Sequence, residues 1–122
     1  MISRDELLQA VATVTNADAD IGTAIPANKR RFIYRIKLVN AFAGPNLLTL
    51  GKRENGAGAT TPIDYVQLAV QYDIFRDPEE LKEDAAPLYI IEGAGAGGAS
   101  HMRGVMDAGN AYLSYWYVDA EA

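Results

Sequence analysis

The sequence predicts an all-β fold, an antiparallel β-sandwich of the jelly-roll kind with six to eight short strands and one short helix. The first observation is alternation over residues 31–38 and 65–74, where apolar side chains occupy every second position. Such a period of two buries one face of a strand and cannot bury one side of a helix. The second observation is that turn-forming residues recur about every ten residues, as they do in sandwiches.

In the first alternating stretch, one face is expected to be apolar and inward, and the other basic and outward. The inward set is Phe32, Tyr34, Ile36 and Leu38, and the outward set is Arg31, Arg35 and Lys37. The second stretch is expected to be one long strand in which Val66, Leu68, Val70, Tyr72 and Ile74 share the apolar face. One wet and one apolar face are typical of an antiparallel sheet.

The other elements follow from local signals. Residues 3–15 are ambiguous, because Ser3 and Glu6 form a helix capping box whereas the β-branched run at 11–15 favours a strand. Asp77 and Pro78 resemble the N-cap and first position of a short helix. Further strands are expected at 47–50, 88–92, 100–106 and 111–118. We divide this single domain into an N-terminal arm or strand at 1–24 and a β-sandwich at 25–122.

Composition limits the function. With 122 residues, 49% of them hydrophobic, the chain can form one domain with one core. It has no cysteine and one histidine, which excludes disulfide scaffolds, thiolate sites and multi-histidine metal sites. A net charge of −5 argues against nucleic-acid binding. The start lacks a signal-peptide pattern, and no apolar run approaches the roughly 20 residues that span a bilayer, so we expect a soluble protein in the cytoplasm.

Charge is unevenly distributed along the chain. Seven of the eleven basic residues lie between Lys29 and Arg53, a window without an acid, and six acids lie between Asp73 and Asp84. The two groups are solvated faces that neutralise each other within one chain, or the basic face of one copy meets the acidic face of a neighbour. The second arrangement would set orientation and association rate more than affinity.

Three constellations are weak candidates for chemistry. The glycine-alanine run at 93–99 has neither the lysine nor the following helix of a phosphate-binding loop, so we interpret it as a corner loop. His101 with Asp107 or Asp119 suggests acid–base catalysis, but a single strand histidine explains it more simply. Asp18, Asp20 and Asp107 suggest a loop cation, although turns favour the same residues. We expect no catalytic residue, no cofactor and no metal.

The last predicted strand, residues 111–118, is unusual because both of its faces are large and apolar. Leu113, Tyr115 and Tyr117 share the face that we expect to fill the core. Tyr112 and Trp116 share the other face, where a sandwich normally meets water. Three interpretations stay open for that face: cover by the N-terminal segment, burial against another subunit, and carbohydrate stacking.

Two segments resemble a known family. IPANKRRFIYRIKLVN at 25–40 resembles the opening strand of small β-sandwich proteins of tailed-phage and related virus particles, which include capsid decoration and head–tail accessory proteins. PLYIIEG at 87–93, a glycine-containing loop and NAYLSYWYV at 110–118 are similar to their second half. The resemblance spans residues 25–118 and leaves out the helix-like start and the glycine-alanine loop. It implies a structural role, oligomeric display on a lattice and no catalytic residues.

We therefore predict a non-enzymatic structural protein of a virion assembled in the host cytoplasm. Its expected partners are copies of itself and a larger protein shell or tail, and not a membrane, a nucleic acid or a small-molecule substrate. The alternatives are a carbohydrate-binding module and a cupin-like enzyme, which the single histidine disfavours. The carbohydrate platform would consist of Tyr112, Tyr115, Trp116 and Tyr117. The predicted contact residues of the structural protein are Tyr112, Trp116, Arg35, Lys37, Lys52 and Arg53.

Overall fold

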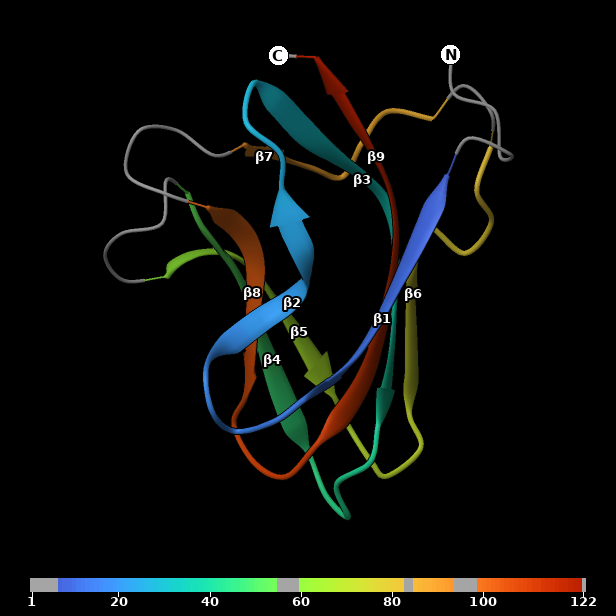
Figure 1. The fold of residues 1–122 in the computed structure, drawn as a ribbon. Helices are drawn as coiled ribbons and strands as arrows, with labels where there is room; N and C mark the ends of the chain where they lie inside the picture. The colour runs from blue at the N-terminus through green and yellow to red at the C-terminus, as the bar shows by residue number, and fades with distance from the viewer. Residues whose placement is uncertain (1–6, 55–59, 83–84, 94–98, 122) are drawn as a thin grey trace.

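The computed structural model describes residues 7–54, 60–82, 85–93 and 99–121, which form two antiparallel sheets packed face to face (Figure 1). The predicted β-sandwich is confirmed. The first sheet has the strand order β1-β9-β3-β6, with β7 also paired to β3, and the second has the order β2-β8-β4-β5. The nine strands within these residues are β1 (Leu8–Val14), β2 (Ala19–Ile25), β3 (Lys29–Asn40), β4 (Asn46–Arg53), β5 (Thr61–Leu68), β6 (Ile74–Asp77), β7 (Tyr89–Glu92), β8 (Ser100–Met106) and β9 (Ala111–Glu121).

The connections give the sandwich its jelly-roll form. Six pairs of consecutive strands cross from one sheet to the other, and four of them share no strand, namely β1–β2, β3–β4, β5–β6 and β8–β9. In both sheets these pairs lie in the same lateral order, with the β8–β9 pair between the β1–β2 pair and the β3–β4 pair. This rolled-up arrangement is that of a double-sheet jelly roll, as predicted.

The core lies between the two sheets and takes alternate residues from each strand. β8 and β9 alternate almost without interruption, so that every second side chain is buried. The described core residues are Val14, Ile21, Ile25, Ile33, Ile36, Leu38, Leu48, Leu50, Val66, Leu68, Ile91, Met102, Met106, Ala111, Leu113, Tyr115 and Tyr117.

A bulge inverts the alternation in β3, so the predicted faces of its first half are wrong. The register of β3 against β9 shifts between Ile33 and Arg35. Beyond the shift the side chains face as predicted. Before it, Arg31 and Ile33 are buried, and Phe32 lies opposite Val118 on the outer side. One extra residue in a strand exchanges the two faces on one side of it.

The second alternating stretch forms two strands and not one. β5 ends at Leu68 in the second sheet, and β6 begins at Ile74 in the first, with exposed Val70 and Tyr72 between them. Asn40 holds this turn through two hydrogen bonds. Its side-chain amide donates to the carbonyl oxygen of Val70 (2.8 Å), and its backbone carbonyl accepts from the backbone amide of Tyr72 (2.8 Å). The turn therefore interrupts a pattern that continues in the sequence.

The short helix predicted after Asp77 is not formed, and residues 78–80 make a bend. The Arg35 guanidinium explains the difference. Its Nε donates to the carbonyl oxygen of Pro78 (3.1 Å), and its Nη2 donates to that of Glu79 (2.9 Å). In a helix these carbonyls would accept from amides one turn further on.

At the N-terminal end, residues 8–14 form β1, which confirms the strand interpretation there. The capping residues Ser3 and Glu6 lie outside the described residues. β1 and β2 each join a sheet, so the segment 1–24 contributes strands to the sandwich itself. In the described part of the chain, no helix is long and apolar enough to span a membrane.

Candidate functional site

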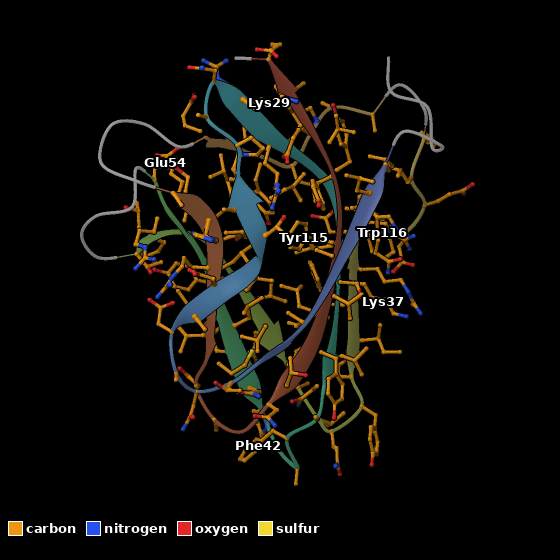
Figure 2. All side chains as sticks on the ribbon, in the orientation of Figure 1. Lys29, Lys37, Phe42, Glu54, Tyr115 and Trp116 are labelled. Carbon is orange, nitrogen blue, oxygen red and sulfur yellow. The ribbon has the colours of Figure 1, made fainter. Side chains whose placement is uncertain are left out.

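β9 divides its large side chains between the two faces of the first sheet. Leu113, Tyr115 and Tyr117 are buried, which confirms the predicted inward set. Tyr112 and Trp116 point outward, and Figure 2 shows Trp116 outside the sandwich and Tyr115 between the sheets. The aromatic platform of the carbohydrate alternative is therefore not formed, because two of its four residues are in the core. β1 lies beside β9 in the sheet and does not cover it.

Outward side chains of the first sheet form four rows that cross the strands, because residues opposite one another in register share a row. We call this surface the outer face. Rows one and four are apolar, row two carries two cations, and row three holds the tryptophan. In the order β9, β3 and then β6 or β7, row one is Tyr112, Val39 and Ile74, row two is Ser114, Lys37 and Arg76, row three is Trp116 and Arg35, and row four is Val118, Phe32 and Ile90.

Several apolar side chains of the outer face are exposed to solvent. The exposed fraction is 53% for Tyr112, 44% for Ile74 and 45% for Ile90. Val11 of β1, which lies opposite Ser114 in row two, is 69% exposed. Outward positions of a sandwich are usually polar, and contiguous exposed apolar surface marks an interaction site. The outer face is thus the strongest candidate for a functional surface.

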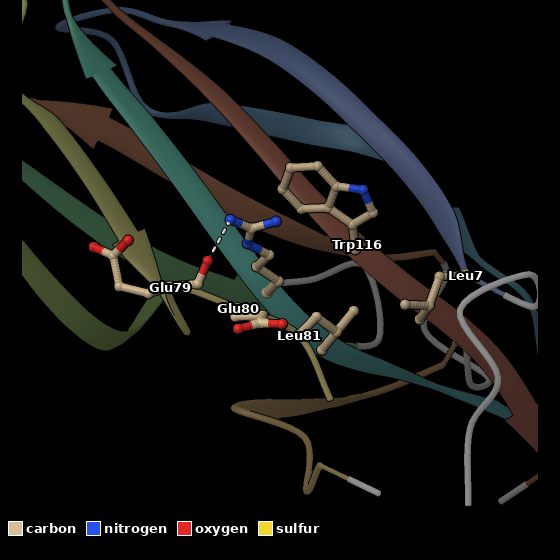
Figure 3. Close-up of a pocket in the computed structure, with 6 residues that line it drawn as sticks. Leu7, Glu79, Glu80, Leu81 and Trp116 are labelled. Atoms are coloured by element: carbon tan, nitrogen blue, oxygen red, sulfur yellow. Dashed lines mark hydrogen bonds between the residues drawn. The ribbon is translucent and has the colours of Figure 1, made fainter. Parts of the chain in front are cut away.

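Row three is held rigidly against the bend after β6. The Arg35 Cζ atom lies 5.2 Å from the centroid of the Trp116 ring, in the range of a cation–π contact. Beside this pair is a hollow of about 280 Å³. Figure 3 shows it between β9 and the bend, where the exposed Glu79 and Glu80 lie. Its lining residues are Leu7, Arg35, Glu79, Glu80, Leu81 and Trp116.

The predicted contact residues do not share one surface. Four of them, Tyr112, Trp116, Arg35 and Lys37, lie on the outer face, and Figure 2 shows Lys37 and Trp116 projecting from the same side. The other two, Lys52 and Arg53, lie on β4 in the second sheet. The basic window in the sequence is therefore divided between the two sheets.

Most cations of that window have acidic partners within the chain. Arg30 pairs with Glu92 (2.9 Å), and Lys52 pairs with Glu54 (3.1 Å). Arg53 lies 3.7 Å from Asp20. These partners lie outside the acidic stretch 73–84, so within the described residues these three cations are not paired with that stretch.

Arg31 is a buried ion-pair residue that sequence reasoning placed on the surface. Its side chain is 1% exposed, and its Nε and Nη2 each donate to one carboxylate oxygen of Asp119 at 2.8 Å. Nη1 donates to the Thr23 carbonyl (2.9 Å) and the Tyr115 hydroxyl (3.2 Å), and Nη2 donates to the Thr23 hydroxyl (3.2 Å). Burial alone lowers the pKa of Arg31, but the Asp119 carboxylate outweighs it and raises that pKa.

The catalytic pairs considered for His101 are not formed. Its Nε2 lies 3.6 Å from Asp20 and not beside Asp107 or Asp119. Asp119 is held by Arg31, and Asp107 is exposed in the turn between β8 and β9. His101 belongs to a polar cluster on the second sheet.

That cluster also contains the two aspartates considered for a loop cation. Arg103 donates to Asp20 and lies 3.5 Å from Asp18. Burial raises the pKa of Asp20, but the Arg103 hydrogen bond and the charges of His101, Arg103 and Arg53 outweigh it and lower that pKa. The carboxylates are thus neutralised by cationic side chains. Across the described ranges, no group of three or more His, Cys, Asp or Glu residues is placed to hold a metal ion.

The glycine-alanine run begins where two strands approach closely. A Cβ atom on Gly93 would lie 2.2 Å from the carbonyl oxygens of both Pro26 and Lys29, so only glycine fits there. Residues 94–98 lie outside the described residues, and the corner-loop interpretation stays a prediction.

Comparison with known proteins adds no relative. No family model matches the sequence, and no curated protein or solved structure is significantly similar to it. The resemblance to phage sandwich proteins therefore stays a prediction, and function has to be argued from the outer face.

Proposed function

We propose that the chain is a non-enzymatic structural protein whose outer face binds copies of itself, a larger protein shell, or both. The observation that carries the proposal is the pair of apolar rows on a sheet face that the described residues do not cover. Tyr112, Ile74 and Ile90 of these rows are exposed by about half. Burial of apolar surface stabilises a complex by about 25 cal/mol per Å² before the costs of association. The exposed halves of these side chains add no burial energy to the folded monomer.

The dimensions of the outer face suit a protein partner. Four strands about 4.8 Å apart and four rows about 6.7 Å apart make a patch of roughly 19 by 27 Å. With side-chain relief, this approaches the roughly 800 Å² per partner of a standard interface. The described residues have 6409 Å² of accessible surface, so such a contact would cover about an eighth of it.

A virus particle is the larger assembly that we propose. Jelly rolls occur in viral capsid proteins, but also in lectins and cupins, so the fold alone does not select among them. The resemblance of residues 25–118 to phage decoration and accessory proteins favours the particle. Three of the carboxylates considered for catalysis or metal binding, Asp18, Asp20 and Asp119, are paired with arginine side chains, which supports a structural role.

Light scattering over a range of protein concentrations tests the proposal. We expect a mass above the 13.2 kDa of one chain, rising with concentration. Tyr112→Ala should lower association, whereas Tyr65→Ala should not, because Tyr65 is equally exposed (60%) but lies on β5 in the other sheet. A mass of one chain at every concentration would contradict self-association. Binding on a glycan array that Tyr112→Ala abolishes would favour the carbohydrate alternative instead.

A further inference from the structure

We propose that two copies pair through their outer faces about a two-fold axis that runs across the strands, between row two and row three. The inference rests on the proposed function and deepens it, because it names a second copy as the partner and sets its orientation. A two-fold axis makes one surface serve both partners, so the outer face must complement itself.

The apolar rows satisfy this requirement. Rotation about the axis exchanges row one with row four and keeps the lateral order of strands, since β6 and β7 both lie on the side of β3 away from β9. On β9, β3 and β6 or β7, every contact between the two rows is then apolar. On β1, Thr13 extends row one. The facing pairs across the interface are Tyr112 with Val118, Val39 with Phe32, and Ile74 with Ile90.

The charged side chains also make the outer face complementary to itself. Among the described residues, Lys37 and Arg76 of row two have no acidic side chain within ion-pair distance. Glu79 and Glu80 follow β6 in the bend beside row three, so the same axis brings Arg76 of β6 toward these two acids of the second copy, twice over. The bend that carries the acids is held by Arg35 through the Glu79 carbonyl (2.9 Å).

Side-chain size also fits at the centre of the interface. Trp116 of row three faces Ser114 of row two in the second copy, which sets a large ring against a small residue. Arg35 then faces Lys37 of the second copy. This like-charge contact is offset, because Arg35 is bonded to two carbonyls and the flexible Lys37 stem reaches the nearby carboxylates.

The alternative face-to-face arrangement is disfavoured by the same side chains. A two-fold axis parallel to the strands would place row two on row two in reversed lateral order. Near β3 and β6 its two cations would then face each other, and neither would meet the acids beside row three. Like charges in contact across an interface weaken it strongly. The charge pattern therefore selects the axis across the strands.

Charge reversal in two matched variants tests the pairing. Arg76→Glu sets an acid against Glu79 and Glu80 of the second copy, and Glu79→Lys with Glu80→Lys sets two cations against Arg76. Each variant alone should associate at least about tenfold more weakly than the wild type. An equimolar mixture should recover association as a mixed dimer, because both charged contacts are then complementary. Sedimentation velocity measures the association, and circular dichroism checks that each variant is folded.

The outcomes separate this inference from the proposed function. A wild-type chain that never associates overturns the two-fold pairing and the self-association in the proposed function. A wild type that associates while the folded variants associate equally well, or while their mixture gains nothing, overturns only the two-fold pairing. Should a reversal impair folding, Arg76→Gln and Glu79→Gln make the same comparison, since each should reduce the salt sensitivity of wild-type association.

Discussion

Replacing Asp119 with alanine should destabilise the fold strongly, because it leaves a charge buried without its partner. In the structure all five N–H donors of Arg31 are used, two of them by Asp119 and three by Thr23 and Tyr115. The Tyr117 ring lies 4.1 Å from the Arg31 Cζ atom and completes the enclosure. Among the partners of Arg31 in the described residues, Asp119 is the one that carries the opposite charge, so its loss leaves the guanidinium charge uncompensated.

The structure sets the expected size of the effect. Breaking a buried ion pair from one side costs about 3–5 kcal/mol. Asp119 is 16% exposed at its side chain, so water can reach the vacated space, and we expect about 3 kcal/mol. For a domain of this size the melting temperature should fall by roughly 10 °C.

Urea unfolding followed by circular dichroism measures the change. Glu92→Ala is the matched control, because its partner Arg30 precedes Arg31 in the chain but forms an exposed pair, with 42% and 53% of the side chains accessible. That variant should lose less than about 1 kcal/mol. Arg31→Met combined with Asp119→Leu should be more stable than Asp119→Ala alone, since it removes both charges. Equal, small effects of Asp119→Ala and Glu92→Ala would refute the reasoning and put Arg31 on the surface.

Other variants test the core, the turn and the outer face. Tyr115→Ala should cost about 3–5 kcal/mol of folding stability, whereas Trp116→Ala should leave the melting temperature nearly unchanged and weaken association by about 2 kcal/mol. The reverse pattern would show that the two faces of β9 are assigned wrongly. Gly93→Ala should lower the free energy of unfolding by about 1–3 kcal/mol, measured by thermal unfolding, because the added Cβ meets two carbonyl oxygens. Gly44→Ala should be neutral, because the atom nearest to its added Cβ is 3.5 Å away, and equal effects of the two variants would contradict this. Asn40→Asp should destabilise the fold by about 1–3 kcal/mol per carbonyl left unbonded, because a carboxylate cannot donate to the two carbonyls that Asn40 binds. An unchanged urea midpoint would show that Asn40 does not hold the turn between β5 and β6.

Uninterrupted alternation explains what could be predicted. In β9 each successive side chain changes face over Ala111–Glu121, so the inward set of Leu113, Tyr115 and Tyr117 could be read from the pattern alone. The sandwich itself could be predicted for the same reason, because several such strands are separated by turn residues. The same alternation puts Tyr112 and Trp116 on the outward face of β9.

Long-range contacts explain what could not. The bulge in β3 leaves the pattern intact because Tyr34 beside it is apolar and buried, so Arg31 appears to alternate outward. The break between β5 and β6 depends on Asn40, thirty residues before the Val70 carbonyl that it binds. The two cations of row two could not be predicted to be neighbours, because only the pairing of β3 with β6 brings Arg76 beside Lys37. None of these contacts leaves a local signal in the sequence.

Fluorescence quenching of Trp116 tests the central claim most directly, because it is the single tryptophan of the chain and lies on the outer face. Acrylamide quenching should be measured across the concentration range in which light scattering reports association. If copies pair through the outer face, quenching of Trp116 falls as the mass rises, and both changes reverse on dilution. If the mass rises while quenching stays constant, the copies associate through another surface and the claim is contradicted.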